Sequence, residues 1–132
     1  MQSFKELEVW KACRQLRMDV WQMVKSFPPE EKYRLSDQMI RCSRSATAQI
    51  AEGYGRFHYL ENVHFCRISR GSLNELIDHL SVALDSEYIS LHSHDKIVAQ
   101  IIACNRILKG YIRYLLQAKK EANEDETRKD IT

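Results

Sequence analysis

Few residues of this 132-residue chain stand at the spacing that metal or enzyme chemistry needs. The nearest match is Glu61-Asn62-Val63-His64. Some four-helix bundles form a di-metal site from a Glu-x-x-His motif on each of two helices and a Glu on each of the other two. The rest of that ligand set is missing, since no Glu or His lies between Lys96 and Lys120. We therefore expect no metal site and no cofactor.

Motifs for hydrolysis or phosphate binding are also missing. No Ser/His/Asp or Cys/His set is supported by the spacing, and Gly53-Tyr54-Gly55 follows an expected helix rather than a strand, so it is not a dinucleotide fingerprint. The four cysteines contain no CxxC pair, which is typical of buried thiols in a reducing compartment. We expect a non-enzymatic protein without a small-molecule substrate.

The segment Ile50-Ala51-Glu52-Gly53-Tyr54-Gly55-Arg56 carries the chain's most unusual carboxylate. Glu52 lies near the end of an expected helix, where a negative charge opposes the helix dipole. We expect an arginine to compensate it in a structural ion pair; the alternative is a catalytic carboxylate. Gly53 and Gly55 offer the left-handed conformation that ends a helix, just before Arg56.

Basic residues give the clearest functional pattern. Six basic residues and no acidic one occur from Lys96 to Lys120. Helical spacing places four of them in one stripe, with Tyr114 nearby to stack on a base, and predicts a shorter stripe on the first helix. Such a stripe fits a nucleic-acid backbone, and the alternative is a solvated helix face. The candidate nucleic-acid-binding residues are Arg106, Lys109, Arg113, Lys120, Lys11, Arg14 and Arg17.

Charge divides the chain into two parts. The net charge is +2, but residues 121–132 carry −3, which leaves +5 on residues 1–120. We expect residues 1–120 to form one domain with its own core and residues 121–132 to be a frayed or disordered acidic tail. The chain has no long apolar run and no signal-peptide pattern, so we expect a cytoplasmic protein that does not contact a membrane.

The elements that position these residues are helical. With only four Gly and two Pro, long segments keep helical periodicity and none alternates like a strand. We expect helices over about 4–26, 35–54, 57–87 and 95–120, the last with Ser93 as its N-cap. Short connectors then give an all-α, antiparallel up-down-up-down four-helix bundle. The expected core residues are Val9, Cys13, Leu16, Val20, Met23, Phe27, Leu35, Met39, Cys42, Ala46, Ile50, Phe65, Ile68, Leu73, Leu76, Leu80, Leu84, Ile97, Ile101, Cys104, Leu108, Tyr111 and Leu115.

Small residues predict where two helices cross closely. Ser43, Ala46 and Ala48 belong to a run of small side chains on the second helix, and Gly71-Ser72 interrupts the third. We expect these two segments to face each other; the alternative is that Gly71 lets a ligand approach. Leucine at Gly71 or Ala48 should then overpack the crossing.

The chain resembles the 23S rRNA intervening-sequence protein family over about residues 4–118. The segments that carry the likeness are Leu7-Glu8-Val9-Trp10; Phe27-Pro28 with Glu31, Tyr33 and Leu35; Gln38 and Arg41; Ile50-Ala51-Glu52-Gly53-Tyr54-Gly55-Arg56; Phe65; and Gly71-Ser72 with Glu75. The resemblance implies an antiparallel four-helix bundle that assembles as a ring-like homopentamer and has no enzymatic activity. Some members are encoded inside bacterial ribosomal RNA genes. Related bundles, the accessory variability determinants of diversity-generating retroelements, bind nucleic acid and a reverse transcriptase.

Two functions follow from these patterns and the resemblance. The first is a homo-oligomeric adaptor that uses its basic surface to bind RNA, a reverse transcriptase or both. The second is a protein-binding scaffold without nucleic-acid contact, in which Trp10, Trp21 and the tyrosines are the anchors.

Overall fold

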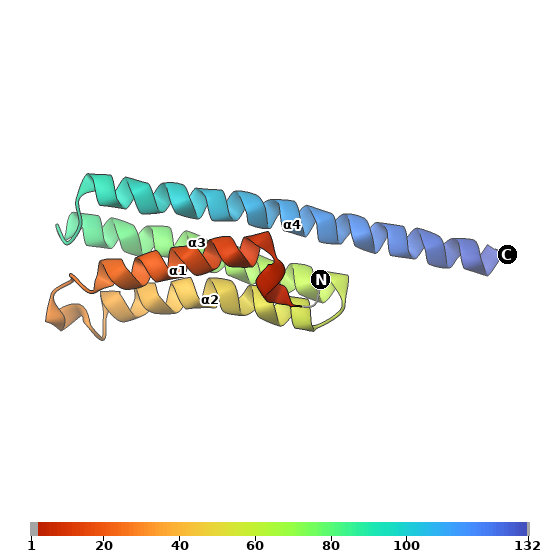
Figure 1. The fold of residues 1–132 in the computed structure, drawn as a ribbon, viewed down its shortest axis with the longest axis horizontal. Helices are drawn as coiled ribbons and strands as arrows, with labels where there is room; N and C mark the ends of the chain where they lie inside the picture. Colours follow the sequence, from red (N-terminus) through yellow and green to blue (C-terminus); the bar gives the residue numbers. More distant parts are fainter. Residues whose placement is uncertain (1–2, 132) are drawn as a thin grey trace.

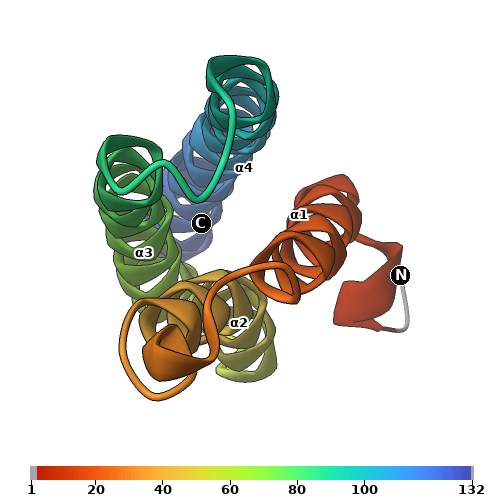
Figure 2. The ribbon, with the colours of Figure 1, turned by 90° about the vertical axis from the view of Figure 1, so that its left-hand side faces the viewer.

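The structure, a computed structural model, describes residues 3–131. Four helices follow one another: α1 (Glu8–Val24), α2 (Leu35–Gly55), α3 (Tyr59–Asp85) and α4 (Leu91–Ile131), with 3-10 turns η1 (Phe4–Glu6) and η2 (Pro29–Glu31). Consecutive helices run in opposite directions (Figure 1), and in the end-on view α1 lies between α2 and α4 (Figure 2). The described residues contain no strand, so the all-α four-helix bundle is confirmed.

The core agrees with the predicted seams in α2 and in part elsewhere. All five predicted core residues of α2 are buried, and so are Val9, Cys13, Leu16 and Val20 of α1. In α3 the prediction was wrong for Phe65, Ile68 and Leu84, which are exposed or half-buried. The predicted core followed the large apolar side chains of this segment, which do not recur at strict helical spacing. Half-buried Met23 and Tyr111 were likewise wrongly placed in the core. The buried apolar or small side chains of α3 are Val63, Cys66, Ser69, Leu73, Leu76, Leu80 and Ala83.

The close crossing of α2 and α3 exists and includes Ala46 and Ser72 of the two predicted segments, but not Gly71. The Ser69 hydroxyl donates to the Ala46 carbonyl at 2.8 Å, and the Ser45 and Ser72 hydroxyls lie 2.9 Å apart. The prediction for Gly71 was wrong, since a Cβ there would meet no atom within 4 Å and the residue is exposed. The face of α3 that meets α2 carries its neighbours Ser69 and Ser72 instead.

A substitution at this crossing should therefore be costly at one position and harmless at another. Ala46→Leu should destabilise the protein by about 1–3 kcal/mol through overpacking, because Ala46 is fully buried beneath Ser69. The expectation that leucine at Ala48 would overpack the crossing was wrong, because Ala48 is exposed. Ala48→Leu is therefore the control and should stay within about 0.5 kcal/mol of the parent. Urea unfolding measures both. Equal stability of the two variants would contradict the placement of Ala46.

The turn after α2 ends the helix without a left-handed glycine. No glycine among the described residues has a positive φ, whereas Phe57 has φ 61°. The helix continues through Gly55, Arg56 keeps helical angles, and Phe57 makes the left-handed step. Gly53 serves close packing instead, because a Cβ there would lie 2.7 Å from Asn62 Oδ1 and 3.0 Å from Phe65 Cβ.

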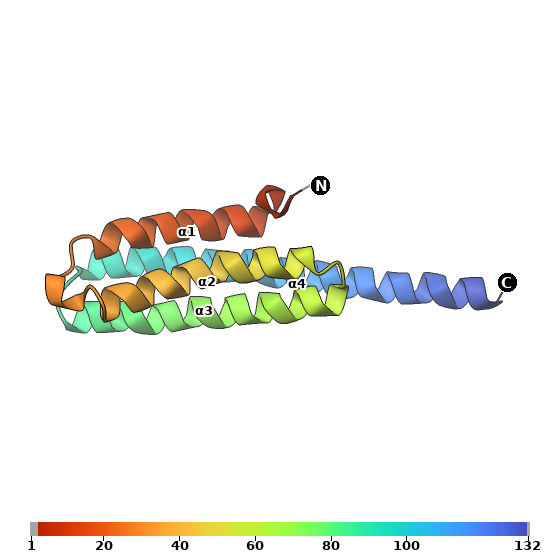
Figure 3. The same cartoon turned by 90° about the horizontal axis from the view of Figure 1, so that it is seen from below.

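Helix α4 is longer than predicted at both ends. It begins at Leu91, where the Ser90 hydroxyl accepts the Ser93 N–H at 3.1 Å, so Ser90 rather than Ser93 is the cap. It continues to Ile131 and extends past the other helices (Figures 1 and 3), so the predicted irregular tail is helical as far as the structure describes it. The reason is its content of Glu, Lys and Ala, good helix formers, with side-chain bonds such as Gln117 to Glu121 at 3.2 Å.

The helices were also considered as membrane spans by their length and apolar character. Within residues 3–131, none is both long enough and apolar enough to cross a bilayer.

Candidate nucleic-acid interface

The predicted stripe of α4 lies on the outside of the bundle. Ile101, Cys104 and Leu108 face the core, and the basic side chains lie on the opposite side of the helix. All four basic side chains are exposed, and none has a hydrogen bond or ion pair to another described residue. The stripe is formed by Arg106, Lys109, Arg113 and Lys120.

Helix α3 adds two arginines to this surface. Asn105 of α4 donates to Asn74 Oδ1 of α3 at 3.4 Å, which identifies the faces where the two helices meet. Arg70 and Arg67 precede Asn74 by four and seven residues, so they share its face and follow α3 alongside the stripe. Both arginines are exposed. We call Arg67, Arg70, Arg106, Lys109 and Arg113 the α3–α4 basic patch.

The patch has a defined limit along α3. Asp78 follows Asn74 by four residues on the same face, so the charge of this face changes sign beyond the two asparagines. The spacing of Arg67, Arg70 and Asn74 is visible in the sequence. Which face of α3 turns toward α4 is not, and the sequence analysis therefore missed both arginines.

The first-helix stripe is not a single surface. Lys11 and Arg14 are exposed on α1, but Arg17 donates from Nη1 to Thr47 Oγ1 of α2 at 2.9 Å. Its guanidinium also lies 5.8 Å from the Trp10 ring centroid. Arg17 thus packs α1 against α2, because its long side chain reaches the neighbouring helix, and its Nη1 is engaged by Thr47.

An aromatic pocket of about 530 Å³ lies at the end of the bundle where the α2–α3 turn meets α4. Tyr114, next to Arg113 of the basic patch, is 64% exposed and stacks on Tyr111 with ring centroids 6.3 Å apart. Asn62 donates to the Tyr111 hydroxyl at 3.1 Å, and burial raises the pKa of that hydroxyl above its ordinary value. We call it the end pocket, and it is lined by Leu7, Tyr54, Phe57, His58, Tyr59, Asn62, Tyr111, Tyr114 and Leu115.

Glu52 forms an ion pair with Arg56, as predicted from its position near the helix end. Arg56 Nη2 lies 2.8 Å from Glu52 Oε1, with both side chains about half exposed. The Arg56 guanidinium also lies 5.1 Å from the Phe65 ring centroid, so the pair joins the α2–α3 turn to α3. An exposed pair of this kind contributes at most about 1 kcal/mol.

A second apolar surface lies between α1 and α2. Met18 and Trp21 are 43% and 44% exposed, and the cations of Lys25 and Arg44 lie 5.5 Å and 5.8 Å from the Trp21 ring centroid. They line a shallow groove with Ile40. Exposed large apolar side chains in one groove are typical of a protein contact surface.

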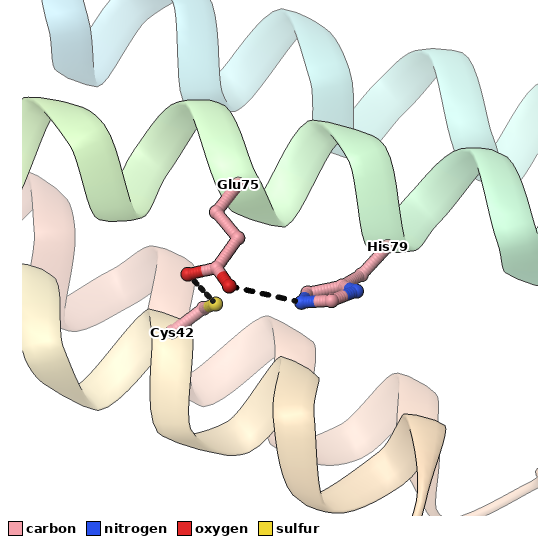
Figure 4. Close-up of side chains that lie close together, drawn as sticks. All are labelled: Cys42, Glu75 and His79. Carbon is pink, nitrogen blue, oxygen red and sulfur yellow. Dashed lines mark hydrogen bonds and ion pairs between the residues drawn. The ribbon is translucent and has the colours of Figure 1, made fainter.

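Three potential metal ligands meet on the opposite side of α3 from the basic patch (Figure 4). Cys42 of α2 donates its thiol to Glu75 Oε2 at 3.0 Å, and Glu75 Oε1 lies 3.6 Å from His79 Nε2. The sequence analysis missed this group because Cys42 lies on another helix. The Glu61 and His64 of the motif it considered are both exposed.

The sequence model of a family described as 23S rRNA-intervening sequence protein matches residues 5–110. A solved protein of unknown function from the S23 ribosomal protein family, from Bacteroides thetaiotaomicron, has a similar fold with a TM-score of 0.73. The two share 21% sequence identity, and the match covers 80% of this chain and 95% of the other. A search of curated proteins found no match.

Proposed function

Because the chain belongs to the 23S rRNA-intervening sequence protein family, we propose that it is a non-enzymatic, homo-oligomeric adaptor that binds RNA through the α3–α4 basic patch. One observation carries the proposal: exposed cations on two neighbouring helices form one surface and have no anionic partner among the described residues. Like charges on one face repel each other and destabilise a bundle slightly. Binding of an anion such as a phosphate would relieve this repulsion.

The length of the patch fits several successive phosphates. Arg106 and Arg113 are seven residues apart, which corresponds to about 10 Å along α4. Arg67 and Arg70 widen the patch onto α3, whose axis lies roughly 8–10 Å from that of α4 in ordinary helix packing. Lysine and arginine heads at this spacing read phosphates rather than base edges, so we expect weak sequence preference.

The end pocket favours RNA that has unpaired bases. Tyr114 is 64% exposed and follows Arg113 in the sequence of α4, and Phe57 is 89% exposed at the rim of the same pocket. Unpaired bases stack on aromatic rings while their backbone follows neighbouring cations. We therefore propose a hairpin loop or single-stranded segment, with its phosphates on the basic patch and one base in the end pocket.

Self-association completes the proposed function. The groove with Met18 and Trp21 supports contact between copies, and the resemblance noted above implies a pentamer. Several copies would repeat the basic patch and increase the effective concentration of cations around one RNA. The same resemblance extends the proposal to a reverse transcriptase as protein partner. The competing function, a protein scaffold that does not touch RNA, is supported by the same groove.

One substitution tests the base-stacking part of this proposal. Tyr114→Ala should weaken binding of an RNA hairpin by about 1–3 kcal/mol, since one stacking surface is lost. Tyr33→Ala is the control, because Tyr33 is 83% exposed next to η2 and outside the end pocket. Fluorescence anisotropy with a labelled hairpin gives both affinities. If the two variants bind equally well, the end pocket does not hold a base.

A further inference from the structure

Three metal-binding atoms come together between α2 and α3. They belong to Cys42, Glu75 and His79. A thiol sulfur, a carboxylate oxygen and an imidazole nitrogen all lie within 4.8 Å of one another. Glu75 and His79 are four residues apart on α3, so both project from the same face, and Cys42 faces them from α2 (Figure 4). Around a tetrahedral zinc ion such atoms lie roughly 3.3–3.8 Å apart, given Zn–N and Zn–S bonds of about 2.0–2.3 Å. Small side-chain rotations would therefore suffice.

The hydrogen-bonding state of His79 indicates a missing partner. Its side chain is only 12% exposed, and Nε2 is buried without a hydrogen bond to any described atom. The nearest acceptor, Glu75 Oε1, is 3.6 Å away, which is too long for a hydrogen bond. A buried ring nitrogen without a partner carries a desolvation cost, and a metal ion in the space between the three side chains would remove it.

The chemistry of the three ligands favours zinc. Thiolate, imidazole and carboxylate all bind Zn²⁺, whereas Mg²⁺ and Ca²⁺ prefer oxygen ligands alone. In the absence of metal, the Cys42 sulfur carries the proton that it donates to Glu75 Oε2. Metal binding then breaks the S–H bond, forms a Zn–S bond and releases the proton to solvent.

We propose that Cys42, Glu75 and His79 form a zinc site that joins α2 to α3. Three protein ligands leave the fourth position of a tetrahedral ion to water, and the Glu75 side chain is 60% exposed, so solvent reaches the site. The site lies away from the basic patch, so the zinc proposal does not depend on whether the patch binds RNA. Its direct consequence is a metal link between α2 and α3, the two helices that have the most extensive contact in the bundle.

Cobalt provides the test, because Co²⁺ replaces Zn²⁺ in such sites and a cobalt–thiolate bond absorbs in the near ultraviolet. The 132-residue chain, reduced and treated with a chelator, is titrated with Co²⁺. We expect a thiolate-to-cobalt band that saturates at one equivalent per chain and disappears on addition of Zn²⁺. Zinc at a hundredfold excess over its Kd should also raise Tm by roughly 5–10 °C.

Matched variants identify the ligands. Cys42→Ser, and separately His79→Gln, should lose the band and weaken zinc binding at least roughly tenfold, since each removes one ligand. Cys66→Ser is the control, because Cys66 is an equally buried thiol of α3 outside the group. Circular dichroism confirms that each variant is helical, and His79→Gln retains the test if Cys42→Ser does not fold. The proposal is overturned if the parent shows no band, or if Cys42→Ser or His79→Gln binds Co²⁺ with the band and affinity of the parent.

Discussion

Replacing Arg106 and Arg113 together by glutamate should weaken RNA binding by roughly a hundredfold at 0.1 M salt. Each phosphate contact contributes about 0.7–0.9 to the exponent of the salt dependence, which corresponds to roughly 0.7–0.9 log units of affinity per contact at that salt. The double variant removes two contacts and adds two negative charges beside Lys109 and the α3 arginines. Both side chains are exposed without partners among the described residues, so the fold should not change.

A matched control separates a local surface from a general charge effect. Lys11→Glu with Arg14→Glu changes the net charge by the same amount on α1, outside the basic patch, and should weaken binding by less than about tenfold. Light scattering should give the same oligomeric mass for the parent and for both double variants. Equal losses of affinity would assign RNA binding to overall charge. A monomeric parent at micromolar concentration would contradict the proposed self-association.

Gly53→Ala should destabilise the protein by about 1–3 kcal/mol, although alanine is the better helix former. The added Cβ would lie 2.7 Å from Asn62 Oδ1, 3.0 Å from Phe65 Cβ and 3.1 Å from the Asn62 carbonyl oxygen. Asn62 cannot turn away freely, because its amide is buried and donates to Tyr111 of α4. The methyl group must therefore separate α2 from α3 or break that hydrogen bond.

The same substitution at Gly71 should have the opposite sign. No atom lies within 4 Å of a Cβ built there, so Gly71→Ala should stabilise the protein by about 0.5–1 kcal/mol through helix propensity alone. Urea unfolding monitored by circular dichroism compares the two variants with the parent. Stabilisation by both alanines, or destabilisation by both, would contradict the packing of α2 against α3 described above.

The two glycines illustrate what periodicity predicts and what it leaves out. The seam of α2 was predicted correctly because its apolar residues recur every three or four positions, from Leu35 to Ile50. Periodicity alone does not choose between a glycine that packs closely and one that faces solvent, because that choice depends on the rotation of the neighbouring helix. Gly53 packs against α3 and Gly71 faces outward, although the sequence analysis assigned a turn to the first and a close contact to the second.

The sequence predicted only part of the interface, because it does not show how one helix is rotated against its neighbour. The exposed stripe of α4 could be predicted, since its four basic residues share one helical face and no acidic residue is near them in the sequence. Arg67 and Arg70 join it only through the register of α3 on α4, which the contact of Asn74 with Asn105 defines. The sequence also does not show that Arg17 reaches the neighbouring helix, where it donates to Thr47.

The salt dependence of RNA affinity tests the central claim, that the α3–α4 basic patch binds the RNA backbone. Affinity for a single-stranded RNA is measured from 50 to 300 mM KCl for the parent and for Arg67→Gln with Arg70→Gln. Glutamine removes the charge of these two residues without reversing it. We predict that the slope of log affinity against log salt becomes shallower by about 1.4, or roughly 0.7 for each lost contact. An unchanged slope would contradict the account, because the two arginines would then contact no phosphate.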